Sequence, residues 1–451
     1  MALIIHTNLT KEKVLIKLQK DLTIHIEPNN KGWSGGGMGG KSKTIYAYNV
    51  DESAENRPVS VPFNYGLTFG GGGDFVRPNR KHLNPMVKEF CGSLRNEQKN
   101  CRDEALTLLQ TYKTAMICCY TGFGKTVTAI NMACKIKLKT FITVPKTPLL
   151  GQWESEIKKF VPGASIAILT PTKIKELTRT QTTPDSQTTP DFCVVNACNI
   201  HKIPQNFLKT YGLVIVDEAH LQLTEGLSFN LLHLTPRYLL GITATPYRED
   251  GYNCLFNMFF GDKKVKYTLQ RKHIVYAVKT GFRPSDKSEN KIRNKVDWNA
   301  ILDEQSKDES RNHLIINIVQ KFKDRVFLIL VKRVEQGQFL LNTLLSLGEK
   351  ATSLLGKQQT YDKEARILIG TNSKIGTGFD HPRLDTLLVA ADMVAYYIQF
   401  LGRVMRRKDV DPIIFDLVDS HPTLKKHFEK RSKIYGKHGG EILKYKLTNE
   451  E

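Results

Sequence analysis

Apolar strand-like runs alternate with amphipathic helical stretches from about Leu94 onward. Runs such as GLVIVD and YLLGITAT come before a polar stretch at residues 283–312, and runs such as RVFLILV and IIFDLVD come after it. Strands that are apolar throughout and separated by helices typically form parallel sheets covered on both faces. The pattern therefore predicts an α/β fold with two parallel-sheet lobes in tandem.

Residues 1–92 have a different pattern of apolar and polar positions. Short alternating runs such as LTIHIE and TIYAYNV are separated by glycine-rich stretches, which favours a small, β-rich domain with long loops. We expect three parts: an N-terminal accessory domain (1–92), a first lobe (93–262) and a second lobe (263–451). The accessory domain is a candidate for nucleic-acid binding, with its aromatic residues packing in a core as the alternative.

The end of the second lobe, from residue 422, is predicted to be a basic helical tail. Its basic residues either form a solvated helix face or contact nucleic acid; they are Lys425, Lys426, Lys430, Arg431, Lys433 and Lys437.

The amino-acid composition indicates which class of molecule the protein binds. The 66 Lys and Arg residues exceed the 45 Asp and Glu residues, which gives a net charge of +21 and suits a polyanion such as nucleic acid. The eight cysteines include no C-x-x-C pair, so we expect buried thiols in a reducing, intracellular compartment and no zinc site. No run approaches the roughly 18 apolar residues of a membrane span, and no signal peptide is expected at the start.

Two segments compete as phosphate-binding loops. GGGMGGKS at residues 35–42 matches the pattern G-x-x-x-x-G-K-[ST] letter by letter. However, an alternating strand pattern follows it, whereas a phosphate loop needs a strand before it and the N-terminus of a helix after it. We therefore interpret this segment as a loop, whose Lys41 and Lys43 could touch a phosphate backbone.

CYTGFGKT at residues 119–126 misses one letter of the pattern but has the required context. An apolar run, TAMICC, precedes it, and a helical pattern follows it. Gly122 and Gly124 allow a tight anion-binding turn, Lys125 can reach the outer phosphates, and Thr126 can ligate Mg²⁺. Downstream, the apolar run GLVIVD ends in Asp217, a Mg²⁺ ligand, and Glu218, which could polarise an attacking water. Together these features predict ATP hydrolysis.

Further segments extend this pair into a known family. DEAH at residues 217–220 and YTGFGKT resemble motifs II and I of superfamily 2 helicases and translocases, whose motif I normally has a small residue in place of the first glycine. Further segments resemble motif Ia (VPKTPLLGQW, 144–153), motif III (TATP, 243–246), motif V (TGFDHP, 377–382) and motif VI (QFLGRVMRR, 399–407), and LRNEQ (94–98) resembles the segment that reads adenine. The resemblance spans roughly residues 94–435 and is closest to compact UvsW-type phage, poxvirus transcript-release and XPB-like helicases.

The resemblance implies two RecA-like lobes, with ATP and Mg²⁺ as cofactors held between them. The ATP-binding residues it implies are Arg95, Gln98, Thr121, Gly122, Phe123, Gly124, Lys125 and Thr126. The catalytic residues are Glu218, Gln399, Arg403 and Arg406, and the Mg²⁺ ligands are Thr126 and Asp217. The residues that would couple the ATP site to a nucleic-acid track are His220, Thr243, Thr245, Gly378 and Asp380. The nucleic-acid contacts are Pro145, Lys146, Asn196, Arg248 and Thr371.

The function that the resemblance favours is an ATP-dependent DNA helicase that separates strands or remodels branched DNA or transcripts. Alternatives are a duplex DNA translocase without strand separation, an RNA helicase, and an ATP-switched nucleic-acid clamp. DNA is the expected partner, with transcription, replication or repair machinery as further candidates, and the protein is expected to be a monomer. The likeness to phage and large-virus proteins favours a viral origin, with the host cytoplasm or the virion as compartment.

Trp153 is predicted to pack in the core.

Overall fold

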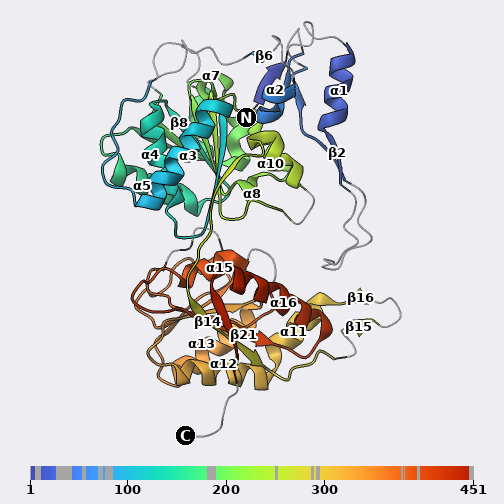
Figure 1. Ribbon diagram of the computed structural model, residues 1–451, viewed down its shortest axis with the longest axis vertical. Coiled ribbons are helices and arrows are strands. Elements are labelled where there is room, and N and C mark those ends of the chain that lie inside the picture. Colours follow the sequence, from blue (N-terminus) through green and yellow to red (C-terminus); the bar gives the residue numbers. More distant parts are fainter. Residues whose placement is uncertain are drawn as a thin grey trace. The chain divides into compact units, whose positions relative to one another are not determined.

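The computed structural model of the protein describes most of the chain as two compact units. The described residues are 2–5, 12–26, 43–52, 57–69, 75–76, 85–179, 189–248, 252–285, 289–290, 295–376, 379, 381–393 and 397–445. The described residues up to Tyr267 form the first unit, apart from Tyr120–Gly122, which group with the second unit, and the rest of the second unit begins at Thr268 (Figure 1). Each contains a seven-stranded sheet.

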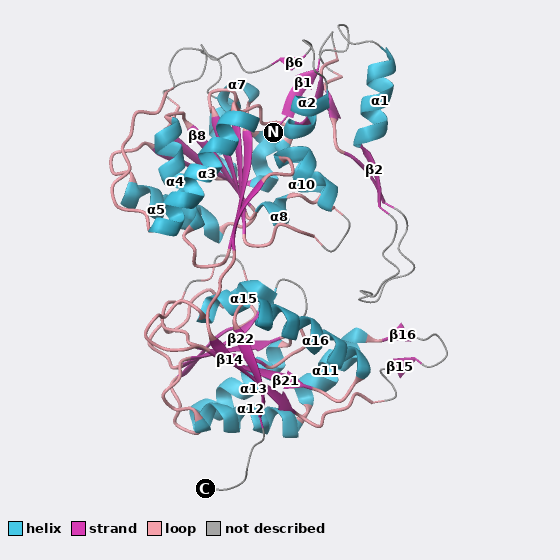
Figure 2. Ribbon diagram, in the orientation of Figure 1, coloured by secondary structure: helices cyan, strands magenta, loops and turns pink. Residues whose placement is uncertain are grey.

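The sheet of the first unit is parallel throughout. Its strands follow the order β13-β7-β12-β11-β8-β10-β9. Their bounds are β7 Thr114–Cys119, β8 Thr140–Val144, β9 Ile166–Leu169, β10 Phe192–Asn196, β11 Leu213–Asp217, β12 Tyr238–Thr243 and β13 Lys264–Tyr267. Every residue of β7, β8 and β11 is buried, because helices cover both faces of the sheet (Figure 2).

The helices of this unit alternate with its strands, as the sequence pattern predicts. Their bounds are α3 Asn96–Tyr112, α4 Lys125–Ile136, α5 Pro148–Phe160, α6 Pro171–Arg179, α7 Gln205–Leu208, α8 Ala219–Gln222, α9 Glu225–Leu231 and α10 Asn253–Phe260, with a 3₁₀ helix at Ala197–Lys202. The first sheet reaches beyond residue 262, the predicted end of the first lobe, because β13 pairs with β7.

The N-terminal residues form a small module that packs on the first sheet's unit. An antiparallel sheet contains β1 (Ala2–Ile5), β4 (Asn49–Val50), β5 (Val59–Pro62) and β6 (Phe75–Val76). A second ladder pairs β2 (Thr23–Ile26) with β3 (Lys43–Tyr46), and the helices are α1 (Glu12–Leu22) and α2 (Phe63–Phe69). Its buried side chains belong to the same hydrophobic cluster as those of α10.

The second unit repeats the parallel arrangement in the order β18-β19-β17-β20-β21-β14-β22. The strands are β14 His273–Lys279, β17 Phe327–Val331, β18 Ala351–Leu354, β19 Ile367–Thr371, β20 Thr386–Val389, β21 Ile413–Val418 and β22 Gly440–Tyr445. The helices are α11 Trp298–Lys307, α12 Glu309–Lys321, α13 Val334–Ser346, α14 Asn372–Ile375, α15 Tyr397–Val404 and α16 Pro422–Lys437. Two short strands, β15 (Glu289–Asn290) and β16 (Lys295–Val296), form a separate ladder.

The two faces of the second sheet have separate cores. Residues of α15 and α16 pack with one set of alternating strand residues, and residues of α12 and α13 pack with the other set. Alternation of this kind follows from the two-residue period of a β-strand. These two sheets confirm the predicted α/β fold with two tandem RecA-like lobes.

Three sequence expectations need correction. The tail from residue 422 is not helical throughout, because β22 follows α16 and pairs with β14. Arg431 is buried at 2% exposure, so it is not part of a solvated basic face. The eight cysteines are free, but Cys91 and Cys198 are exposed.

The segment 35–42, including Lys41, lies outside the described residues. None of the helices in the described part of the chain has the length and apolar character that a membrane span requires.

Candidate active site

The segment between β7 and α4 has the geometry of a phosphate loop. Strand β7 ends at Cys119 and helix α4 begins at Lys125. Gly122 and Gly124 adopt φ angles of +90° and +88°, a left-handed conformation that favours glycine. A helix N-terminus presents backbone N–H groups and a positive dipole end. The loop therefore suits an anion, and the Lys125 ammonium, 3.1 Å from the Cys119 carbonyl oxygen, adds a positive charge beside it.

The start of α3 braces this loop. The Gln98 amide donates to the Phe123 carbonyl at 2.9 Å, and the Arg95 guanidinium donates to the same oxygen. The Gln98 side-chain oxygen also accepts from the Arg95 backbone N–H at 2.8 Å. The Phe123 ring is buried and packs against Tyr267, with 5.4 Å between ring centroids. Arg95 and Gln98, two of the predicted ATP-binding residues, thus also hold the phosphate loop in place.

Three strand ends meet beside the loop. Thr243 of β12 pairs with Cys118 of β7, and Asp217 of β11 pairs with Ile242 of β12. Because the carboxyl ends of parallel strands share one edge of the sheet, the phosphate loop, Asp217 and Thr243 are brought to the same edge. They come from segments that are far apart in the sequence.

Asp217 is a buried carboxylate with three polar neighbours. Its Oδ2 accepts a hydrogen bond from the Trp153 indole N–H at 2.9 Å, and its Oδ1 accepts from the Glu218 backbone N–H at 2.9 Å. Burial and, to a lesser extent, the adjacent Glu218 carboxylate together raise the pKa of Asp217 to about 7, against the opposite effects of Trp153 and Lys125. The buried pair of carboxylates therefore disfavours the charged form of Asp217.

Glu218 has an unusual backbone conformation. Its φ of +45° and ψ of +54° lie in the left-handed region, which is uncommon for a residue with a side chain and costs roughly 1–3 kcal/mol. The bend turns the chain directly from β11 into the short helix α8. It brings Glu218 Oε2 to 3.4 Å from His220 Nδ1.

His220 links the end of β11 to the end of β12. Its Nδ1 lies 2.8 Å from the Thr243 hydroxyl, which also donates to the Thr245 carbonyl oxygen and accepts from the Thr245 backbone N–H. The Thr243 hydroxyl has only one proton, which it donates to the Thr245 carbonyl oxygen. It therefore accepts the hydrogen bond from His220, whose Nδ1 carries the proton. Burial lowers the pKa of His220 to about 4, so the ring is neutral at pH 7.

Arg248 contacts the backbone of His220. It is 9% exposed, its guanidinium donates to the His220 carbonyl oxygen, and it lies 5.5 Å from the centre of the Tyr252 ring. Little of the side chain remains for the predicted nucleic-acid contact. The geometry instead connects Arg248 to the residues predicted to couple the two sites.

In the second unit, Gln399 and Arg403 are buried on α15, and Arg406 follows the helix half-buried. The Arg403 guanidinium donates to the carbonyl oxygens of Gly376 and Phe379. These hydrogen bonds connect motif VI, on α15, to the segment of motif V. Burial lowers the pKa of Arg406. The two other motif V residues that were predicted to couple the sites, Gly378 and Asp380, lie outside the described residues.

The remaining predicted nucleic-acid contacts differ in exposure. Lys146 is exposed and Pro145 half-buried after β8, whereas Thr371 is 9% exposed at the end of β19. The Asn196 side chain accepts from the Cys198 backbone N–H at 3.1 Å, which caps the short 3₁₀ helix that follows β10. Lys146 is thus the most accessible of this group.

Two residues of the site were not assigned these roles from the sequence. Trp153 is buried in the core as predicted, and its indole also holds Asp217. Gln222, buried on α8, donates to the carbonyl oxygens of Asp217 and Thr143 and accepts from the Thr143 hydroxyl. It therefore joins the ends of β11 and β8. The only sequence signal for Gln222 is its position two residues after the DEAH segment.

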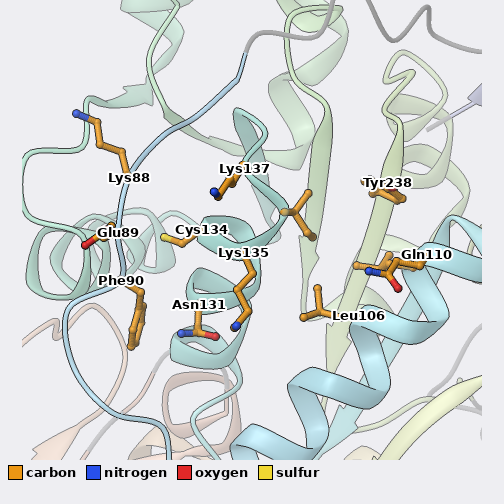
Figure 3. Close-up of a pocket in the computed structure, with 12 residues that line it drawn as sticks. Lys88, Glu89, Phe90, Leu106, Gln110, Asn131, Cys134, Lys135, Lys137 and Tyr238 are labelled. Atoms are coloured by element: carbon orange, nitrogen blue, oxygen red, sulfur yellow. The ribbon is translucent and has the colours of Figure 1, made fainter.

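A cavity of about 700 Å³ lies elsewhere in the first unit (Figure 3). It is lined by α3, the second half of α4 and the segment around Phe90, with Lys88, Lys135 and Lys137 at its polar positions. The phosphate loop is at the opposite end of α4, and the described residues that line this cavity include none of the predicted ATP-binding residues. This cavity is separate from the candidate active site.

Comparison with known proteins decides the family. The family described as "Type III restriction enzyme, res subunit" matches residues 91–248. The chain is 40% identical over 463 aligned residues to "Putative helicase 161L" of Invertebrate iridescent virus 6, covering 98% of this chain and 99% of that protein. The chain belongs to the superfamily 2 helicases.

More distant members of the superfamily also match. The transcript termination protein A18 of Fowlpox virus is 23% identical over 389 residues, which covers 78% of this chain and 79% of that protein. The crystal structure of T4 UvsW aligns with 97% of each chain at 16% identity and a TM-score of 0.37. The predicted likeness to a poxvirus transcript-release protein is confirmed by the match to A18.

Proposed function

We propose that this protein hydrolyses ATP at the edge of the first sheet and uses the energy to move along DNA and separate its strands. The observation that carries the proposal is that the phosphate loop after β7 and the carboxylates at the end of β11 lie at the same edge of the sheet, on either side of β12. A strand, a glycine turn and a helix N-terminus bind phosphate, and two carboxylates opposite them handle a metal and a water.

The residues present fit a magnesium ion. Asp217 and Glu218 are adjacent carboxylates, and burial and mutual repulsion raise the pKa of Asp217 to about 7. A divalent cation would relieve this repulsion, and oxygen ligands are those that Mg²⁺ prefers. Asp217 and Thr126 would hold the ion, which would supply neutralisation of the phosphate charge during transfer.

The side chains divide the chemistry between them. Lys125 would hold the outer phosphates, and Glu218 would orient the attacking water and accept its proton. The left-handed backbone at Glu218 and the Trp153–Asp217 hydrogen bond keep the two carboxylates in fixed positions. From the second unit, Gln399 and Arg406 would act on the γ-phosphate. Arg406 suits the role because a guanidinium carries a charge in a planar fork.

Coupling to nucleic acid would use the hydrogen bonds beyond Glu218. His220 connects the catalytic carboxylate to Thr243 and Thr245, and Arg248 holds the His220 carbonyl. A change at the γ-phosphate would thereby reach the turn that follows β12. Lys146 and Asn196, the more exposed of the predicted contacts, are proposed to contact the phosphate backbone, without sequence preference and with strong dependence on salt.

DNA is the proposed track and RNA the second candidate. The net charge of +21 supports any nucleic acid, and the similarity to a transcript termination protein supports action where DNA and RNA are both present. Transcription, replication or repair machinery would be the setting in an infected cell, with the protein acting as a monomer. A duplex translocase and an ATP-switched clamp are the alternatives within the same fold.

The deciding experiment compares ATP hydrolysis by the full chain in the presence of duplex, single-stranded or forked DNA, or RNA. Glu218→Gln serves as the control, because it removes the catalytic carboxylate while keeping size and polarity. We expect DNA to stimulate the wild type and the variant to show no stimulation. A strand-displacement assay on the forked substrate then separates a helicase from a translocase.

The outcomes distinguish the alternatives. An ATPase indifferent to every nucleic acid would contradict the motor, and stimulation by RNA alone would contradict the DNA assignment. ATP binding without turnover would favour the clamp.

A further inference from the structure

Helix α16 has two faces of opposite character. Its buried face carries Leu424, His427, Arg431 and Tyr435. Its exposed face carries Lys426, Lys430, Lys433 and Lys437, which we name the lysine stripe. The stripe residues are spaced by four, three and four positions, so they lie along one side of the helix.

The lysine stripe has no evident role in holding the fold together. Among the described residues, no ion pair is formed by any of its four ammonium groups. Like charges three or four residues apart repel one another by roughly 0.2–0.5 kcal/mol per pair. One exposed carboxylate, Glu429, is the only acidic residue within the helix. The repulsion therefore persists in the folded protein unless a polyanion binds.

The helix is held rigidly from its other side. The Arg431 guanidinium makes two hydrogen bonds of 2.8 Å to the Asp416 carboxylate of β21, and further ones to Asp392 and to the Met393 carbonyl. Tyr435, one turn later, donates to Asp416 at 2.6 Å. A surface presented by an anchored helix is preorganised, so binding loses little conformational freedom.

We propose that the lysine stripe of α16 binds the phosphate backbone of nucleic acid. The stripe spans about 16 Å of helix axis, and each lysine has a flexible four-carbon stem. Neighbouring ammonium groups can therefore reach successive phosphates without reading the bases. This inference rests on the proposed function, because it adds a contact surface to the same motor.

The salt dependence of binding tests the proposal. The variant Lys426→Gln/Lys430→Gln/Lys433→Gln removes three charges of the stripe. A matched control, Lys321→Gln/Lys323→Gln/Lys350→Gln, removes three exposed charges elsewhere in the second unit. Fluorescence anisotropy with a labelled 30-base-pair DNA duplex, the corresponding single strand and an RNA strand gives the slope of log affinity against log salt.

The stripe variant should reduce the slope by about 0.9 per lost contact on duplex and about 0.7 on single strands, and the control should leave it unchanged. ATP hydrolysis without nucleic acid should match the wild type for both variants. Equal slopes for wild type and stripe variant would overturn the inference, as would equal reductions in both variants. If the wild type binds none of the three probes, the proposed function itself fails.

A second inference comes from the buried side of the same helix. The Tyr435 hydroxyl lies 2.7 Å from that of Tyr397, the first residue of α15. Arg431 binds Asp392 and Met393, which precede α15. The network thus holds the start of the helix that carries Gln399 and Arg403, with Arg406 just beyond it.

The geometry points to Tyr397 and Tyr435 as positioning residues for motif VI. Removing the Tyr397 hydroxyl frees the first turn of α15 while the ring remains packed against Tyr435, with 5.5 Å between centroids. Displacements below 1 Å are costly for groups that act in a transition state. The two hydroxyls therefore affect turnover without touching ATP.

Tyr397→Phe and Tyr435→Phe test this role, with Tyr276→Phe on β14 as a matched control of the same chemistry in the same unit. Tyr397→Phe and Tyr435→Phe should each lower kcat by about three- to tenfold, while the KM for ATP should change less than about twofold. The double variant should be no slower than Tyr435→Phe, since that single variant already removes both the contact with the Tyr397 hydroxyl and the hydrogen bond to Asp416.

A fall in thermal stability with unchanged kcat would mean a purely structural role and would overturn the inference. So would an equal fall in kcat for Tyr276→Phe. A wild type without ATPase activity would instead contradict the proposed function.

Discussion

At the residue scale, the site depends on side chains whose neighbours come from distant parts of the chain. Trp153 lies 64 positions before Asp217, yet its indole donates to that carboxylate. Cys119 takes the place of the first glycine of the phosphate loop, but it is the last residue of β7, where the backbone is extended and needs no glycine. Within the phosphate loop, the glycines that adopt positive φ angles are Gly122 and Gly124. The letters of the pattern matter less than the backbone that they allow.

Two lysines give a direct test of which segment binds phosphate. Lys125→Ala should lower ATP hydrolysis by about 10²-fold or more, because it removes a charge aimed at the transferring phosphate. Lys41→Ala should leave ATP hydrolysis nearly unchanged. Steady-state ATPase rates measure both, and circular dichroism checks folding. A large loss of rate in Lys41→Ala alone would reverse the assignment.

The pKa of Asp217 predicts how nucleotide binding depends on pH. Below its pKa of about 7, Asp217 is protonated and binds a cation poorly, so binding of a fluorescent Mg·ATP analogue should be about tenfold weaker at pH 6 than at pH 8. Trp153→Phe removes an N–H that lowers this pKa, and should move the transition to higher pH. Trp298→Phe in the second unit is the control. A pH-independent affinity in the wild type would contradict the prediction.

At the element scale, strand ends and the short helices after them carry the chemistry. Strand β11 ends in Asp217, the chain bends at Glu218, and α8 returns His220 and Gln222 to the ends of β12 and β8. The alternation of apolar and amphipathic runs predicted these strands, whereas the short helix α8 was not assigned from the sequence. It did not predict β22, because the basic character of the tail masked a short strand that pairs with β14.

The contact between α8 and β12 predicts separable activities. Thr243→Val keeps the shape of the side chain but removes the hydroxyl that faces His220. Basal ATP hydrolysis should stay within about threefold of the wild type, while stimulation by nucleic acid should be largely lost. Thr107→Val, on the exposed side of α3, is the control. Undiminished stimulation in Thr243→Val would exclude this coupling route.

At the scale of the whole molecule, the N-terminal module is not separate from the first lobe. Leu3, Val61 and Phe63 share a hydrophobic cluster with Phe256 and Phe259 of α10. The Asn64 amide also donates to the Asn257 carbonyl oxygen at 3.0 Å. Part of the apolar surface of the module is therefore buried against α10, and that part would be exposed to water in the isolated module.

This shared core predicts that residues 1–84 do not fold in isolation. The fragment should show no cooperative thermal transition by near-ultraviolet circular dichroism, whereas the full chain should. The full-length variant Asn64→Ala should lose about 1 kcal/mol of unfolding free energy, measured by denaturant titration. A sharp transition in the fragment would restore the view of an independent accessory domain.

The sequence by itself determined the elements that depend on local pattern. Apolar runs set the strands, helical periodicity set the intervening helices, and the order of short motifs indicated superfamily 2. These features are local because periodicity and backbone preference act over a few residues. The sequence also separated the two candidate phosphate loops by their flanking patterns.

Only the tertiary structure decided which side chains meet. It buried Arg431 against Asp416 instead of exposing it with the lysines of α16, and it brought Trp153 to Asp217. It also joined the N-terminal module to α10. The physical reason is that strand order sets these contacts between residues far apart in the chain, and strand order depends on the packing of the whole sheet.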